Sequence, residues 1–154
     1  MKKLFALLFT IIIFSSVHAQ TNDDLLNKNR NFTGAVADKK DYYAIYQLDN
    51  NDPKVIEKAL RNIQNALNDE RLKGKVHIEL IAFAGGTDAY FKDSKYGDQL
   101  KSLVEQGVIV AQCNNTLRER KISRDSIYNF IGVVPSANGE LIIRQAQGWG
   151  VVKP

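Results

Sequence analysis

Cys113 is the only cysteine of this 154-residue chain, and its thiol offers the most chemistry of any side chain in it. It ends an apolar run, 108–113, that is typical of a buried strand. The next three residues, Asn114, Asn115 and Thr116, favour a helix N-terminus. A thiol at such a junction lies at the carboxyl end of a strand, where α/β sheets bind ligands and helix N–H groups favour the thiolate. A small buried hydrophobic role explains a lone cysteine equally well.

Few other residues have catalytic potential. His77 is the only histidine after residue 19 and lies inside an expected strand, so a serine hydrolase would need it to reach a serine at the sheet edge. One cysteine and one histidine are too few ligands for a metal site in a single chain. Trp149 could lie over a pocket, although a core or interface position is more usual for tryptophan. If the chain is an enzyme, we expect its chemistry at the Cys113 thiol rather than at a hydrolase site, without metal or cofactor.

The elements that must position Cys113 alternate between strand and helix. The strands are expected at 41–48, 76–83, 108–113, 131–135 and 149–154. The helices are expected from Pro53, with Asp52 as N-cap, to Gly74, from Tyr96 to Gly107, and from Ser136 to Gly148, with a short helix or turn in 123–130. Such alternation implies parallel strands joined by right-handed crossovers. We therefore predict an α/β fold, a three-layer sandwich with a mostly parallel sheet of about five strands.

Two adjacent glycines, Gly85 and Gly86, follow the expected strand 76–83. They would allow the backbone to approach a ligand or a neighbouring chain closely. Their spacing favours a plain tight turn. They form neither a P-loop nor a dinucleotide-binding fingerprint, because both motifs need further glycines.

The first 19 residues have the pattern of a secretory signal peptide. A basic start precedes an apolar run at 4–14, and small residues at 17–19 predict cleavage before residue 20. The apolar run is too short for a comfortable membrane span, so we expect no stable membrane insertion after cleavage. The mature protein is then periplasmic or secreted. Residues 20–40 are expected to form a polar, loosely ordered arm before a domain at 41–154.

The charges and the single cysteine limit which kinds of partner the protein could have. The chain has 21 Lys and Arg residues and 17 Asp and Glu residues, and a signal peptide with Lys2 and Lys3 removes two of the basic ones. The remaining charges are interleaved, which indicates a solvated surface and no nucleic-acid partner. A single cysteine cannot form an intrachain disulfide, so after export the thiol is shielded, joined between chains or kept for chemistry.

Several short segments resemble the DsrE/DsrF-like family, and together they span residues 41–154. They are Asp52-Pro53 ahead of the helix at 59–63 (which resembles exported members), Cys113-Asn114-Asn115-Thr116-Leu117, Val133-Val134-Pro135-Ser136, Glu140-Leu141-Ile142, Gln145, Gly148 and Lys153-Pro154. The resemblance implies a flavodoxin-like sheet in a homo-oligomer, either a trimer or a hexamer.

The resemblance also implies a function. Cys113 would accept or relay sulfane sulfur as a persulfide, exchanged with a small sulfur compound or a partner thiol protein. The candidate substrate-binding residues are Gly85, Gly86, Asn114, Asn115 and Thr116. Many relatives carry a His-Gly-Pro-Gly-like turn where this chain has 83–86 without a histidine. Export would also separate the protein from cytoplasmic relay partners, so we expect no sulfur transfer to tRNA. The alternative is a non-catalytic oligomeric binding or scaffold protein with a structural cysteine.

Overall fold

The computed structural model describes residues 22–154, which belong to two units, one ending at Val36 and one from Ala37 to Pro154. The predicted signal peptide, residues 1–19, lies outside the described residues. Residues 22–30 are helical, which differs from the loosely ordered arm expected there. Among residues 22–154, no helix combines the length and the apolar character that a membrane span requires.

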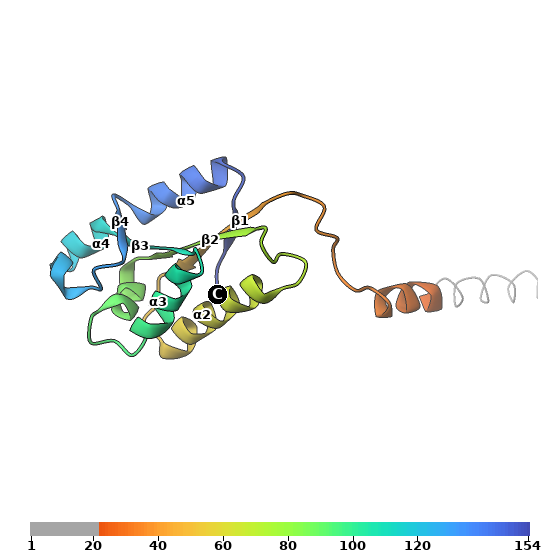
Figure 1. Cartoon of the computed structure of the whole chain (residues 1–154), viewed down its shortest axis with the longest axis horizontal. Helices are drawn as coiled ribbons and strands as arrows, with labels where there is room; N and C mark the ends of the chain where they lie inside the picture. The colour runs from red at the N-terminus through yellow and green to blue at the C-terminus, as the bar shows by residue number, and fades with distance from the viewer. Residues whose placement is uncertain (1–21) are drawn as a thin grey trace, which may run out of the picture. The chain divides into compact units, whose positions relative to one another are not determined.

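A five-stranded parallel sheet forms the centre of the second unit (Figure 1). Its strands are β1 (Tyr42–Leu48), β2 (Val76–Ala82), β3 (Ile109–Cys113), β4 (Gly132–Val134) and β5 (Gly150–Val152). They lie in the order β4-β3-β2-β1-β5, and every neighbouring pair is parallel. The two outer strands contain only three residues each. The predicted sheet is thereby confirmed.

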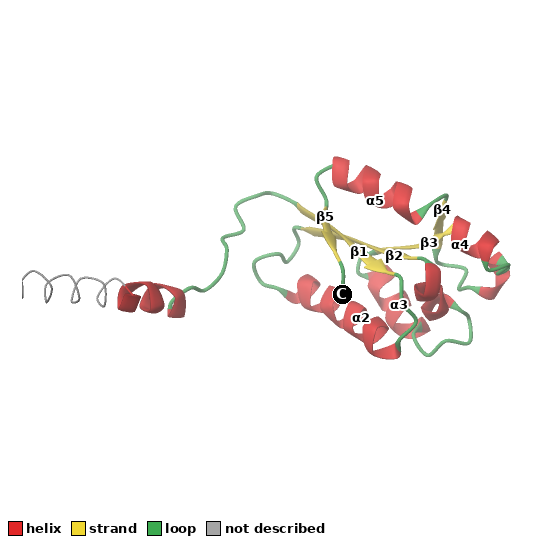
Figure 2. Cartoon of the chain, turned by 180° about the vertical axis from the view of Figure 1, so that it is seen from behind, coloured by secondary structure: helices red, strands yellow, loops and turns green. Residues whose placement is uncertain are grey.

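Helices cover both faces of the sheet, which confirms the predicted α/β architecture. α2 (Pro53–Asn68) and α3 (Gly97–Glu105) lie on one face, and α5 (Ala137–Ala146) lies on the other (Figure 2). The short helix α4 (Asn114–Glu119) follows β3 directly. Two 3₁₀ helices, η1 (Ala84–Tyr90) and η2 (Arg124–Ser126), complete the connections.

The start of α2 agrees with the sequence prediction, and its end does not. Asp52 caps the helix by accepting a hydrogen bond from the Lys54 N–H at 2.9 Å, and Pro53 occupies the first turn, as predicted. The helix ends at Asn68 rather than at Gly74, so that prediction was wrong. Its apolar face ends at Leu67, and Gly74 serves instead in the turn before β2, with a φ of +73°.

Strand alternation divides the core into two clusters. Ile78, Leu80 and Ala82 of β2 pack on the side of α2 and α3, in the larger cluster. The smaller cluster lies on the side of α5 and contains Ile45, Ile81, Ala111, Cys113 and Ala137. Cys113 therefore faces α5.

Gly85 and Gly86 lie in η1 rather than in a plain turn. An added Cβ on Gly86 would overlap the backbone carbonyl of Leu48 in β1, and one on Gly85 would approach the backbone nitrogen of Asn51 to 3.0 Å. Both glycines let η1 lie directly against β1 and the loop that follows it.

Candidate functional site

Cys113 is the last residue of β3 and the N-cap of α4, so the predicted junction of strand and helix is present. Its side chain is 5% exposed, and the thiol is free. The strand ends there because Asn114 and Asn115 begin the helix at once. The thiol is thus held by rigid elements on both sides of it in the sequence.

Several hydrogen-bond donors surround the sulfur. The Ala137 N–H, at the start of α5, donates to Cys113 Sγ at 3.3 Å. The backbone N–H groups of Asn115 and Thr116 and the Thr116 hydroxyl also interact with the thiol. α5 begins there because Ser136 caps it, with its Oγ accepting from the Gly139 N–H at 3.3 Å. The sulfur therefore lies at the N-termini of two helices.

These donors determine the acidity of the thiol. Burial raises the pKa of Cys113, whereas the hydrogen bonds from Ala137, Thr116 and Asn115 lower it. The hydrogen bonds outweigh the burial, and the pKa lies below its ordinary value. The nucleophilic thiolate is therefore easier to form here than in a cysteine with the ordinary pKa.

A cavity of about 180 Å³ lies beside Cys113. Three segments form its wall: the end of β2 with the start of η1, the junction of β3 and α4, and the start of α5. The lining residues are Phe83, Ala84, Cys113, Asn115, Thr116, Glu119, Ser136, Ala137 and Asn138. The volume suits a small molecule, and most of the polar groups in the wall are uncharged amides and hydroxyls.

Hydrogen bonds fasten η1 to α4 at this wall. The Ala84 N–H donates to Thr116 Oγ1 at 3.1 Å. The Arg120 guanidinium donates to the Ala84 carbonyl at 2.8 Å and to Asp88 Oδ1 at 2.7 Å. Ala84 adopts a left-handed conformation, with a φ of +47°, which these bonds hold in place.

The structure brings together some of the predicted site residues. Cys113, Asn115 and Thr116 line the cavity, whereas Asn114 does not. Gly85 and Gly86 are also outside its wall, because they pack against β1 and the loop after it.

Sequence reasoning missed the contribution of α5. Ser136 was predicted only at the start of a helix and within one of the resembling segments, and neither Ala137 nor Asn138 was singled out. β3 and β4 are neighbours, so their carboxyl ends meet at the same edge of the sheet and bring α5 to the thiol. The order of the strands was the missing information.

His77 and Trp149 do not take part in this site. His77 is the second residue of β2, and the strand register places it about 20 Å from the end of β3. Its Nε2 lies 3.1 Å from Asp41 Oδ1, and its ring stacks on Tyr43. Trp149 also contacts Tyr43, with 5.2 Å between ring centroids. Within residues 22–154, no group of three or more His, Cys, Asp or Glu side chains could hold a metal ion.

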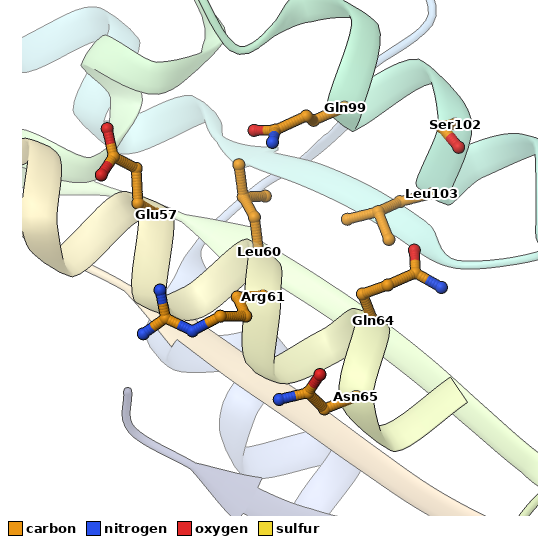
Figure 3. Close-up of a pocket in the computed structure, with 8 residues that line it drawn as sticks. All are labelled: Glu57, Leu60, Arg61, Gln64, Asn65, Gln99, Ser102 and Leu103. Carbon is orange, nitrogen blue, oxygen red and sulfur yellow. The ribbon is translucent and has the colours of Figure 1, made fainter. Parts of the chain in front are cut away.

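A larger groove of about 520 Å³ lies between α2 and α3 (Figure 3). Its residues are Glu57, Leu60, Arg61, Gln64, Asn65, Gln99, Ser102 and Leu103. They include neither a cysteine nor a histidine, and Leu60 and Leu103 belong to the core cluster on the side of the sheet away from Cys113. We therefore place the candidate site at Cys113.

The fold and the site define a class of protein: an α/β domain with a parallel sheet and a thiol held at a strand end by helix N–H groups. The chain belongs to the DsrE/DsrF-like family, whose model matches residues 55–154.

Solved structures share this fold. The chain is similar to MTH1491, a protein of unknown function from Methanobacterium thermoautotrophicum, at 30% identity over 74% of this chain and 100% of that one, with a TM-score of 0.70. It is also similar to BT1422, a conserved protein of unknown function from Bacteroides thetaiotaomicron, at 14% identity over 79% of this chain and 100% of that one, with a TM-score of 0.60.

A third similar structure is the ychN protein from E. coli, at 17% identity over 73% of this chain and 99% of that one, with a TM-score of 0.56. No curated protein matched the sequence. At these identities BT1422 and the ychN protein inform the fold alone.

Proposed function

We propose that this protein accepts and relays sulfane sulfur as a persulfide on Cys113. The observation that carries the proposal is the 3.3 Å hydrogen bond from the Ala137 N–H to Sγ, in a site where donors hold the thiol pKa below its ordinary value. Membership of the DsrE/DsrF-like family suggests a role related to sulfur relay and so supports the same reading.

The transfer balances without an external oxidant. The Cys113 thiolate attacks the terminal sulfur of a persulfide R–S–SH, and a new S–S bond forms at Sγ. The S–S bond of the donor breaks, and R–S⁻ leaves with its electron pair while the proton stays on the transferred sulfur. The N–H donors around Sγ favour the attacking thiolate, and in the reverse step they stabilise it as the leaving group.

The donor and acceptor are a small sulfur compound or the thiol of a partner protein. The cavity of about 180 Å³ supports a small molecule, since Cys113 is nearly buried behind its wall. Asn115, Ser136 and Asn138 offer uncharged hydrogen-bonding groups to it.

A non-catalytic binding or scaffold protein is the second candidate. The observation that favours it is the 5% exposure of Cys113, which is usual for a structural cysteine. The two candidates differ in the reactivity of the thiol in the folded protein.

Two measurements on the folded protein test the proposal. The rate of alkylation by iodoacetamide against pH, with Cys113→Ser as the blank, should show a midpoint below that of a free thiol, about 8.5. Intact mass after exposure to polysulfide should show one added sulfur atom that reduction removes. A thiol that stays unlabelled and gains no sulfur would favour the structural candidate.

Export and assembly are further parts of the proposal. The signal-peptide pattern of residues 1–19 supports a periplasmic or secreted location. Exposed apolar side chains support a homo-oligomer, a trimer or a hexamer; they are Ile109, Ile142, Ile143 and Val151. Light scattering that gives a monomer at micromolar concentration would contradict the assembly.

A further inference from the structure

α5 is fastened to the sheet at two points. At its start, the Ala137 N–H donates to Cys113 Sγ. Two turns later, Arg144 Nε donates to Glu79 Oε2 at 2.7 Å, and Glu79, in the middle of β2, is only 1% exposed. Arg144 also lies 3.0 Å from Glu140 Oε1 on its own helix, and its guanidinium lies over the Trp149 ring.

We propose that Glu79 and Arg144 are positioning residues, which hold α5 so that its first N–H group reaches the sulfur of Cys113. The inference rests on the proposed function, because it concerns the thiol that would carry the sulfur. Neither residue touches that sulfur, and each would act through the helix.

The second half of α5 has few apolar contacts of its own. Ala137 is the only buried residue of the helix, and Leu141 is partly buried against the same cluster. Ile142 and Ile143 are 68% and 53% exposed. Apolar contacts of the helix therefore hold its start, and its second half is held by the ion pair and by the Trp149 ring that lies against Arg144.

Because α5 is short, the position of Arg144 affects the position of the Ala137 N–H beside the thiol. Arg144 is seven positions after Ala137, which is about 10 Å of α-helix. A helix of this length is rigid, so a shift or tilt at Arg144 moves the first turn as well. A hydrogen bond to sulfur at 3.3 Å is sensitive to such a movement.

The chemistry of Glu79 indicates positioning more than stability. Its Oε1 has no hydrogen-bond partner, and the residue interrupts an otherwise apolar stretch of β2. Burial raises its pKa, the nearby Glu140 carboxylate raises it too, and Arg144 opposes both. The other titratable group that interacts with Glu79 is the buried Tyr90 of η1, whose pKa Glu79 helps to raise. Apolar side chains in place of a buried ion pair often give a core that is equally stable. An ion pair, by contrast, fixes the relative orientation of the two elements that carry it.

A direct electrostatic effect of Glu79 on the thiol has the opposite sign. Glu79 pairs with Ile109, so Cys113 lies four residues further along β3, about 13 Å away. Both groups are buried, so salt screens this interaction only weakly, and its sign decides the comparison. Any remaining effect of removing the negative charge would lower the thiol pKa, whereas loss of the Ala137 hydrogen bond would raise it.

The test compares Glu79→Gln with Glu140→Gln in the whole protein. Both variants remove one carboxylate from Arg144, but only the first replaces the ion pair between α5 and the sheet by, at most, a weaker neutral hydrogen bond. We expect Glu79→Gln to move the midpoint of the alkylation rate to higher pH and to slow alkylation at pH 7 severalfold. It should also speed hydrogen exchange of the Ala137 amide, and Glu140→Gln should do neither.

An unchanged or lower midpoint in Glu79→Gln would overturn the inference, as would the same rise in both variants. If Glu79→Gln does not fold, Arg144→Lys keeps the charge with a different geometry, and the same rise is expected. These readouts do not require sulfur transfer. If the wild-type protein takes up no sulfur, the proposed function fails, and the comparison of variants still decides the role of Glu79.

Discussion

Gly86→Ala should be among the most destabilising single-methyl additions available in this protein. The new Cβ would overlap the Leu48 carbonyl oxygen and lie 2.5 Å from the carbonyl carbon. Leu48 is fully buried at the end of β1, between β2 and β5, so its backbone has little freedom to retreat. Overpacking a core costs about 1–3 kcal/mol when side chains can adjust, and a clash with a buried backbone belongs at or above the upper limit, about 3 kcal/mol.

Thermal unfolding measures this effect. For a domain of this size, about 3 kcal/mol corresponds to a fall in Tm of roughly 10 °C. Gly132→Ala makes the same chemical change, but its Cβ would lie 3.6 Å from the Val110 carbonyl oxygen, an ordinary contact, so its Tm should hardly change. Equal melting temperatures for Gly86→Ala and the wild type would show that η1 does not lie against β1 as described.

Two further predictions concern the site and the buried carboxylate. Thr116→Val removes the hydroxyl that accepts a hydrogen bond from the Ala84 N–H and helps to lower the Cys113 pKa. Urea unfolding should therefore show a loss of about 1 kcal/mol in stability, and the alkylation midpoint should move to higher pH. Thr116→Ser keeps the hydroxyl and should keep the wild-type stability and midpoint. Because the pKa of Glu79 is raised by folding, its contribution to stability is present below the unfolded pKa of 4.5 and is lost as pH rises through the folded pKa. Glu79→Gln should therefore gain stability relative to the wild type as pH rises. A difference in Tm between the two proteins that stays constant from about pH 4 to pH 8 would contradict this.

Much of the fold could be predicted because its signals are local. Asp52 and Pro53 mark the start of α2, and the alternation of strands with helices dictates a parallel sheet. The end of α2 was missed because Gly74, a residue type typical of helix C-termini, lies instead in the later turn before β2. The helix at 22–30 was missed because residues 20–40 are polar and show no sustained apolar periodicity.

The site could be predicted only in part, because half of it is built from contacts distant in the sequence. Cys113 and Thr116 follow from one junction of strand and helix. The Ala137 N–H comes from 24 residues further on and the Glu79–Arg144 pair spans 65 residues, so neither has a sequence spacing that would reveal it. The one sequence signal for this pair was Glu79 itself, because a carboxylate inside the apolar strand 76–83 needs a positively charged or hydrogen-bonding partner on another element.

The brevity of β4 and β5 has a consequence for how copies of this chain can meet. An edge strand offers unpaired N–H and C=O groups to any other strand that approaches, and long flat edges are templates for aggregation. Here each edge ends after three residues, so an added strand would find few backbone partners. If copies associate, they would do so through side-chain surfaces, whose shape and composition can select a partner, and the backbone edges would contribute little.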